Sequence, residues 1–452
     1  MLDGPLFPSI VSYTIPIMLT SILQLLFNAA DLIVVGRFCG SVSVAAVGAT
    51  GAISGLIVNL FVGISVGASV TVAHALGSNN AEAAHRTVHT ALPTALVSGI
   101  FLTLVGIPLA KPLLQLMDTP ENVLPLSTVY MQIYFAGMTF NMVYNFCAAI
   151  LRAAGDTKSP LIFLTIAGVL NVGLNVIFVT AFDMNVAGVA LATAASQAVS
   201  AVLVIIALMR RTDGCKLYLK KLRFYKPQLL EMLRIGIPSG IQSSLFSISN
   251  VTIQSSINSF GDIAMSGNAA AQNIEAFVYM ALNAFYQTAM NFTGQNAGAG
   301  KYKRVGKVVG ICMSCTLVLG IVLSGIVVFF APRLLSIYIT DSSEAIQYGV
   351  LRMNIVCALY FLCGLMEIPG GALRGLGISM PPMLASIIGV CGIRIGWILL
   401  LFPIPMFHSI QSIYWSYPIS WLITALLQLG MFIHAYRKRL KMNPEPQVLP
   451  NK

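Results

Sequence analysis

Three carboxylic acid side chains fall inside long apolar segments of the chain. Asp31 ends the stretch Asn28–Asp31 in the first apolar segment, and Glu275 and Glu367 lie within two later ones. An ionisable group inside a membrane span costs at least about 2.5–3.5 kcal/mol, because burial disfavours the charged form. Such groups can exchange a proton or bind a cation. We therefore treat all three acids as candidate functional residues.

Amide and hydroxyl side chains are spaced to complete a site around Asp31. Asn171 and Asn175 stand four residues apart, so they share one helix face, and Thr193 follows in the next apolar segment. Carboxylate, amide and hydroxyl oxygens are the ligands of a small hard cation. The pattern predicts a cation-coupling site for Na⁺ or H⁺. In the alternative readings Asp31 is solvated or pairs with Arg37, and the asparagines only join two helices.

Glu275 and Glu367 are candidates for binding a cationic substrate or a proton. Arg394 is the only basic residue that we expect deep within a span. One glutamate could therefore pair with Arg394 structurally. The other would then be free for substrate or proton.

The elements that must position these side chains are membrane helices. Hydrophobic residues make up 57% of the 452 residues and charged residues only 9%, whereas soluble domains carry about a quarter charged residues. Continuous apolar runs, long enough to cross about 30 Å of hydrocarbon, favour helices over a β-barrel. We predict twelve transmembrane helices, at residues 8–36, 44–76, 84–109, 123–153, 159–181, 186–210, 229–260, 264–297, 303–330, 345–374, 379–401 and 411–436.

The sequence contains an internal repeat. Leu151–Gly155 returns as Leu373–Gly377, 222 residues later, and Pro16 returns at the same spacing as Pro238. Six spans per copy make the repeats parallel. We expect an all-α integral membrane fold, with two parallel six-helix lobes around a central cavity. Proline kinks helices, so Pro16 and Pro238 are candidate hinges, although membrane helices also tolerate proline without such a role.

The distribution of charge predicts the topology and the domain limits. With the N-terminus inside, most of the 26 basic residues fall on cytoplasmic loops, which follows the positive-inside rule. Those on outer loops are Arg37, Lys111, Arg333 and Arg352. We expect a multi-pass protein of the cell membrane, with both termini cytoplasmic and an uncleaved first span. The net charge of +11 then reflects topology, and we expect no nucleic-acid partner. The predicted domains are an N-terminal lobe 1–209, a basic linker 210–234, a C-terminal lobe 235–440 and a tail 441–452.

Residue patterns for metal or enzyme chemistry are weak. Cys312 and Cys315 lie in an apolar run and are best interpreted as core residues. His85 and His89 have the spacing of a metal clamp, but no third ligand is suitably spaced. No phosphate-binding loop or catalytic triad is evident. We predict no metal, no cofactor and no enzyme, with an ion gradient as the energy source.

Five motifs together resemble the bacterial type of the multidrug and toxic compound extrusion (MATE) family, over about residues 5–440. They are DLIVVGRF at 31–38, LRAAGDT at 151–157, VAGVALAT at 186–193, GQNAGAG at 294–300 and GALRGLG at 371–377. The resemblance implies two lobes forming a V-shaped cavity, and export of organic cations in exchange for Na⁺ or H⁺. It also implies that Asp31, Asn171 and Thr193 match the family's N-lobe cation site, and that Pro16 matches its first-span bend.

Two positions depart from the family's pattern. Asn175 stands where better-characterised members carry Asp, so the site has one carboxylate fewer and the coupling ion stays open. Cys363 stands where another branch has an acid in the tenth span, and Glu367 lies one turn further on, on roughly the same face. The resemblance therefore transfers no C-lobe ion site.

We predict a monomeric, cation-coupled secondary antiporter that exports organic cations and amphipathic drugs by alternating access. The first alternative is a flippase for a lipid-linked precursor. It would need a strongly cationic cavity, and only Arg394 is expected to lie deep. The second is a membrane-embedded transferase, which would need an Asp-x-x-Asp pair or a reactive histidine.

Overall fold

The computed structural model describes residues 1–117, 119–340 and 342–442, and the side chains of all of these except residues 52 and 53. Within these ranges the regular structure is entirely helical. Of the predicted tail 441–452, residues 443–452 lie outside the described residues.

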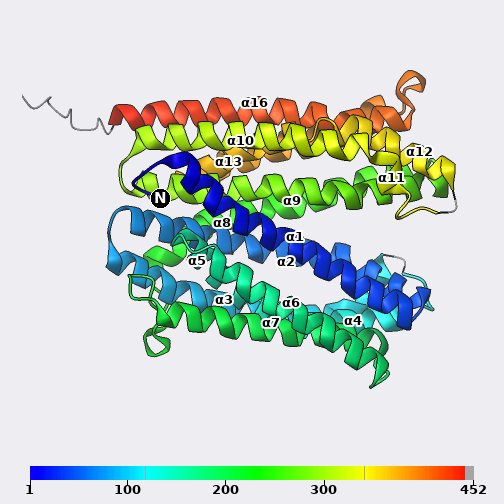
Figure 1. Cartoon of the computed structure of the whole chain (residues 1–452), viewed down its shortest axis with the longest axis horizontal. Helices are drawn as coiled ribbons and strands as arrows, with labels where there is room; N and C mark the ends of the chain where they lie inside the picture. The colour runs from blue at the N-terminus through cyan, green and yellow to red at the C-terminus, as the bar shows by residue number, and fades with distance from the viewer. Residues whose placement is uncertain (118, 341, 443–452) are drawn as a thin grey trace, which may run out of the picture. The chain divides into compact units, whose positions relative to one another are not determined.

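The helices follow the predicted spans closely (Figure 1). The first half contains α1 (Leu6–Phe38), α2 (Ser41–Gly77), α3 (Ala81–Leu116), α4 (Leu124–Ala136), α5 (Met138–Ala153), α6 (Lys158–Thr180) and α7 (Asn185–Arg210). The second half contains η1 (Leu219–Lys221), α8 (Lys226–Asn258), α9 (Asp262–Gly298), α10 (Tyr302–Phe329), α11 (Ala331–Leu335), α12 (Ser343–Arg352), η2 (Met353–Cys357), α13 (Phe361–Gly375), α14 (Met380–Ser386), η3 (Ile387–Gly392), α15 (Ile393–Gly396), η4 (Trp397–Leu401), η5 (Pro405–Phe407) and α16 (Ile410–Met442).

Two predicted spans are each a bent pair of helices. The predicted span 123–153 is α4 followed by α5 with a bend of 47°, and 345–374 runs from α12 to α13 with a bend of 42°. Counting each pair once, up to 10 segments are long and apolar enough to cross a membrane. α8 and α9 are also long, with 33 and 37 residues, but more polar. With these two, the described residues hold the twelve transmembrane helices that the sequence predicts.

The chain forms two compact units that do not coincide with its two halves. Unit 1 comprises residues 1–14, 73–79 and 248–452, and unit 2 comprises 15–72 and 80–247. α1, α2 and α8 each contribute to both units. The compact units therefore do not test the predicted domain limits, which follow the sequence repeat and stay a prediction: 1–209, 210–234 and 235–440. Within the predicted linker, residues 226–234 form the first part of helix α8.

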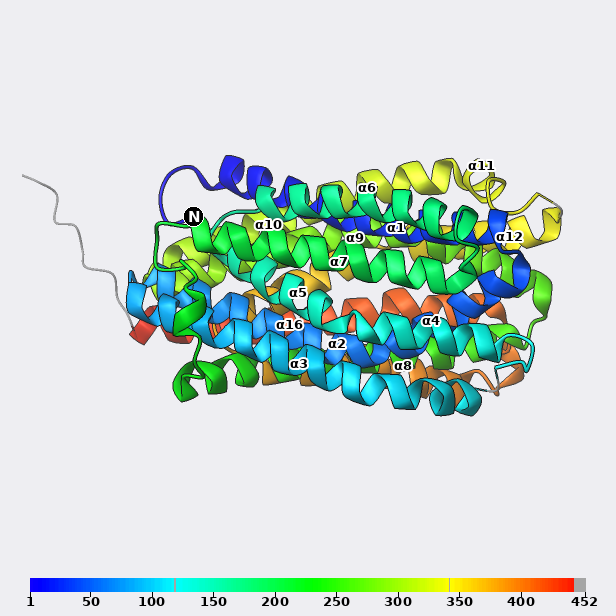
Figure 2. The same cartoon turned by 90° about the horizontal axis from the view of Figure 1, so that it is seen from below.

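Long helices pack side by side within each unit. In unit 2, α6 and α7 run along each other, and α3 packs against α4 and α5 (Figures 1 and 2). In unit 1, α13 packs against α9 and α16, and α10 lies beside α9. The α6–α7 pair carries three of the four residues of the predicted cation site.

A glycine-lined contact joins α2 to the first part of α8 within unit 2. On α2 the contact is formed by Gly63 and Gly67, and on α8 by Gly236 and Gly240. On each helix, three residues separate the two glycines. A Cβ atom at Gly63 would lie 2.2 Å from the backbone nitrogen of Gly240. Small residues at this spacing let membrane helices approach at backbone distance. The contact explains how α8 packs against the first repeat, although it begins the second.

The repeated motif ends two helices in the same way. Leu151–Gly155 closes α5 and Leu373–Gly377 closes α13, and their final glycines have φ of 92° and 80°. In each copy the glycine N–H donates to the carbonyl three residues back, at 3.0 and 2.8 Å. The next N–H donates to the carbonyl five residues back, at 2.9 Å in both copies. This is a Schellman cap, which favours glycine at the left-handed position, and it accounts for the glycine in both copies.

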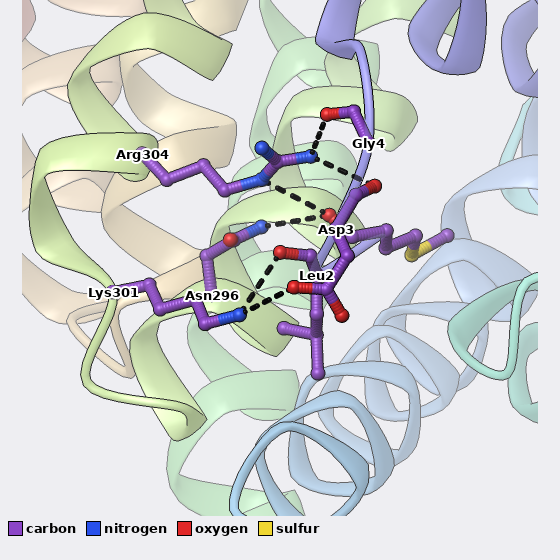
Figure 3. Close-up of polar contacts among 7 residues, drawn as sticks. Leu2, Asp3, Gly4, Asn296, Lys301 and Arg304 are labelled. Carbon is purple, nitrogen blue, oxygen red and sulfur yellow. Dashed lines mark hydrogen bonds and ion pairs between the residues drawn. The ribbon is translucent and has the colours of Figure 1, made fainter.

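An N-terminal arm, residues Met1–Gly4, is held by side chains from the end of α9 and the start of α10 (Figure 3). Lys301 donates to an arm carbonyl at 3.1 Å and to the Asp3 carboxylate at 2.8 Å. Arg304 donates to three arm carbonyls at 2.9–3.4 Å, and Asn296 donates to one of them. The hydrogen bond from Lys301 lowers the pKa of Asp3. These contacts lie within unit 1, to which residues 1–14 belong.

The connection between α7 and α8 is fastened to α3. His89 Nε2 accepts the Tyr218 N–H at 3.0 Å, and its Nδ1 lies 2.7 Å from the carbonyl of His85. Thr90 Oγ1 accepts the Tyr225 N–H at 3.1 Å. Both ring nitrogens of His89 are therefore occupied, Nδ1 within α3 and Nε2 by the connection, which gives His89 a structural role.

The α2–α8 contact predicts a position-specific effect on stability. Gly63→Ala would place a methyl group against the backbone of α8, and overpacking of this kind costs about 1–3 kcal/mol. We expect the thermal unfolding midpoint of the detergent-solubilised protein to fall by several degrees. Gly55→Ala on the same helix is the matched control, because a Cβ there meets nothing within 4 Å. Equal midpoints for the two variants would contradict the predicted overpacking.

Candidate functional site

Asp31, Asn171, Asn175 and Thr193 come together within unit 2, from α1, α6 and α7. Asp31 is 8% exposed and Asn175 is fully buried. α1 reaches α6 because Gly168 leaves room for a side chain: a Cβ there would lie 1.9 Å from the Phe27 ring.

Hydrogen bonds connect these four side chains in a ring. Asn175 Nδ2 donates to one oxygen of the Asp31 carboxylate and, at 3.3 Å, to Asn171 Oδ1. Thr193 Oγ1 lies 3.5 Å from the other carboxylate oxygen and accepts from Asn171 Nδ2 at 3.3 Å. Asn175 Oδ1 is buried and accepts no hydrogen bond. The ring thus leaves one buried oxygen atom available to a further donor or a cation.

The Asp31 carboxylate has neutral neighbours. Its hydrogen bonds among the described residues come from Asn175 and Thr193, and Arg37 is exposed and forms no ion pair with it. The alternative pairing of Asp31 with Arg37 is therefore wrong. A buried carboxyl held by neutral donors, without a basic partner, can change its protonation state or accept a small cation without breaking an internal ion pair.

Glu275 forms a buried ion pair with Arg352, not with Arg394. Arg352 Nε and Nη2 donate to the two oxygens of Glu275 at 2.9 and 2.8 Å, and Nη1 donates to Asn268 Oδ1 at 2.9 Å. Arg352 also lies over the Tyr417 ring, 5.0 Å from its centroid. The sequence-based placement of Arg352 on an outer loop is wrong, since it ends α12 and is 2% exposed.

This ion pair gives Glu275 a structural role. Both of its carboxylate oxygens are occupied within the protein, and the bidentate geometry is the strong form of this interaction. Glu275 was a candidate for substrate or proton binding, and nothing in its surroundings now favours that role. Arg352 lies within the predicted span 345–374, and that position was the signal that it is buried.

Glu367 lies on α13 and is partly buried, one turn after Cys363. It forms no hydrogen bond or ion pair with another described residue, and Arg374 is the basic residue whose charge acts on it. Arg374 Nη1 donates to the Tyr286 hydroxyl at 2.6 Å. Of the three candidate acids, Asp31 and Glu367 thus have no ion-pair partner in the described chain, and the role of Glu367 in substrate or proton binding stays a prediction.

The two hinge candidates lie in different surroundings. Pro16 is buried within α1, next to the point between Thr14 and Ile15 where the helix passes from unit 1 to unit 2. Pro238 lies between the two glycines with which α8 contacts α2, inside unit 2. Pro16 is therefore the better placed of the two for a bend, and both hinge roles stay predictions.

Comparison with known proteins gives one consistent result. The MatE family model matches residues 16–177 and 238–399. The probable multidrug resistance protein YoeA of Bacillus subtilis is 26% identical over 94% of this chain and 93% of its own length. The probable multidrug resistance protein NorM of Thermotoga maritima is 26% identical over 85% of this chain and 83% of its own. The crystal structure of MATE in the bent conformation has the same fold, with a TM-score of 0.91 over 98% of both chains at 20% identity.

The Glu275–Arg352 pair predicts a large loss of stability when one partner is neutralised. Glu275→Gln leaves Arg352 buried without its counter-charge, and breaking such a pair costs about 3–5 kcal/mol. We expect a clearly lower thermal unfolding midpoint in detergent. Glu344→Gln, an exposed acid at the start of α12, should leave the midpoint unchanged. A Glu275→Gln midpoint equal to that of the wild-type chain would show that the pair is not required for the fold.

Proposed function

Since the chain belongs to the MatE family of membrane transporters, we propose that it exports organic cations and amphipathic compounds in exchange for a cation bound at Asp31. The family places it among transporters rather than enzymes, which removes the membrane-embedded transferase alternative. Two relatives that match nearly all or most of this chain are named as probable multidrug resistance proteins. Their names support small-molecule export as the function.

The observation that carries this proposal is the neutral ring around Asp31. A carboxyl buried in a membrane protein without a basic partner is unfavourable as a structural element. Here Asn175 and Thr193 donate to it while Asn175 Oδ1 stays unpaired. Binding of a cation would neutralise Asp31 and reorganise its hydrogen bonds. That change gives ion binding a means to alter the packing of α1 against α6 and α7.

A proton fits this ring better than Na⁺. The site contains one carboxylate, and Asn175 already presents its N–H₂ group to it. A proton needs one free lone pair, whereas Na⁺ needs several oxygen ligands turned inward together. Na⁺ is the second candidate because rotation of the Asn175 amide would bring its unpaired oxygen to the carboxylate. The proposed coupling ion is therefore H⁺, with Na⁺ as the alternative to be tested.

Coupling requires that ion and cargo stabilise different conformations. Ion binding at Asp31 changes the charge of α1, and Pro16 on the same helix supplies a position where its backbone lacks one hydrogen bond. We propose that the neutralised site favours a bend in α1, which lowers the affinity for bound cargo. Release of the ion to the opposite side would restore the high-affinity state.

One observation favours a second function, a flippase for a lipid-linked precursor. Arg352 and Arg374 are buried in unit 1 as well as Arg394, whereas only Arg394 was expected to lie deep. Glu275 neutralises Arg352, so the cationic character is weaker than the count suggests. Translocation of a fluorescent lipid-linked phosphate in proteoliposomes without an imposed gradient would support the flippase instead.

Neutralising Asp31 should abolish coupling. We expect Asp31→Asn proteoliposomes to lose at least about 90% of gradient-driven ethidium transport, because the variant can no longer exchange a charge at the site. The transport is measured with H⁺ and Na⁺ gradients imposed separately, and the H⁺ gradient should drive the wild-type chain. Asp183→Asn, which neutralises an exposed acid between α6 and α7, is the matched control and should transport normally.

Gradient-driven transport by Asp31→Asn at the wild-type rate would overturn the role of Asp31. Transport by the wild-type chain that is driven by Na⁺ and not by H⁺ would replace the proton by Na⁺ and leave the rest of the proposal in place.

A further inference from the structure

A basic segment, residues 216–226, lies in the connection between α7 and α8 and ends at the first residue of α8. It contains no acid and five basic residues: Lys216, Lys220, Lys221, Arg223 and Lys226. None of the five forms an ion pair with another described residue, whereas Arg86 and Arg211 of the same unit are each paired with an acid. The like charges of the basic segment repel one another, so a negatively charged partner would stabilise it.

The backbone of the basic segment is fixed to the protein, and its charges are exposed. The backbone N–H groups of Tyr218, Arg223 and Tyr225 donate to His89 and Thr90 of α3, at 3.0–3.3 Å. Four of the five basic side chains are exposed, and the fifth is partly exposed. The hydrogen bonds therefore hold an ordered backbone from which the cations reach the surroundings of the protein.

Exposed apolar side chains are interleaved with these cations. Tyr218, Leu219 and Phe224 are between 42% and 50% exposed. The Nζ atoms of Lys216 and Lys221 both lie near the Tyr218 ring, 5.3 and 4.9 Å from its centroid. Water solvates ammonium groups well but not apolar side chains. The surface therefore fits a partner that is both anionic and apolar.

The contacts to α3 place the basic segment at the boundary of the membrane. α3 is long and apolar enough to cross a membrane. The last charged residue in its first part is Arg86, and the next one is Lys111. His89 and Thr90 follow Arg86 by three and four residues, which is about 5–6 Å along the helix. The basic segment is thus fastened where the apolar part of α3 begins, and headgroups meet hydrocarbon at that level.

We propose that the basic segment binds an anionic phospholipid. Its phosphate would lie at Lys216 and Lys221 beside the Tyr218 ring, with Leu219 and Phe224 against the acyl chains. A basic residue near a membrane surface strengthens binding to anionic lipid about fivefold. A free phosphate ion would satisfy the charges but leave the exposed apolar side chains without a partner. The lipid accounts for both features.

This inference goes beyond the proposed function, because it concerns the lipid around the protein and neither its cargo nor its coupling ion. Lipid binding can be measured without an ion gradient and without transport. The result is the same whether or not Asp31 couples an ion.

The test compares two phospholipids that have identical acyl chains and different headgroups. Native mass spectrometry of the full-length protein in a neutral detergent gives the apparent affinity for the first bound dioleoylphosphatidylglycerol or dioleoylphosphatidylcholine. We expect the wild-type chain to bind the anionic phosphatidylglycerol at least about tenfold more tightly. Lys216→Gln with Lys221→Gln should weaken phosphatidylglycerol binding about tenfold and leave phosphatidylcholine binding unchanged. The matched control, Arg437→Gln with Lys438→Gln, removes two exposed charges near the end of α16 and should behave as the wild-type chain.

A second variant tests the apolar part of the surface. Tyr218→Ser with Leu219→Ser keeps every charge of the basic segment and removes two exposed apolar side chains. It should weaken the binding of phosphatidylglycerol severalfold. Unchanged binding in this variant would count against a lipid as the partner.

Three further results would overturn the proposal. Equal affinity of the wild-type chain for the two lipids would show that the surface does not recognise the negative charge, and this result depends on no variant. Unchanged phosphatidylglycerol binding after Lys216→Gln with Lys221→Gln would place the lipid elsewhere. Displacement of phosphatidylglycerol by an equal concentration of inorganic phosphate would show a site for small anions instead of a lipid.

Discussion

A charge placed inside a membrane helix is unfavourable unless other groups neutralise it or bind it, and the polar side chains within the spans follow this constraint. Glu275 and Arg352 satisfy each other with two hydrogen bonds and are enclosed by aromatic rings. Asp31 is held by neutral donors alone, and Arg394 is stacked on aromatic rings without an acid. The paired charges hold helices together. Asp31, which has no basic partner, is the position at which we propose that a cation binds.

Close backbone approach makes these polar contacts possible. Glycines bring α2 to α8, and Gly168 lets the Phe27 ring of α1 settle against α6 beside the Asp31 site. In unit 1, Gly298 on α9 meets the backbone of His74, and His74 Nε2 lies 2.7 Å from the carbonyl of Gly375. These glycines are therefore packing residues. Their function is to bring helices near enough for short polar side chains to meet.

The sequence alone predicted the spans and the helix class, because these depend on local periodicity. It also grouped Asp31 with Asn171, Asn175 and Thr193, through the four-residue spacing of the two asparagines and the resemblance to the family. The repeat at 222 residues has a structural counterpart, since Leu151–Gly155 and Leu373–Gly377 end their helices in the same cap. The partner of Glu275 was missed, since Arg352 is 77 residues away and only the fold brings the two together. The sequence also did not predict which segments form each compact unit, because residues 1–14 and 73–79 join a segment that begins only at residue 248. Spacing within one helix carries no information about such contacts.

The N-terminal arm has a consequence for how the protein is made. Leu2 and Lys301, which bond to each other, are 299 residues apart. At about 5–20 residues per second of synthesis, the ribosome needs roughly 15–60 s to add the residues between them. For that time the arm has no permanent partner, although α1 beside it has long been synthesised. Docking of the arm is thus a late step of biogenesis. We expect a substitution at Lys301 or Arg304 to slow the maturation of the newly made chain more than it changes the properties of the finished protein.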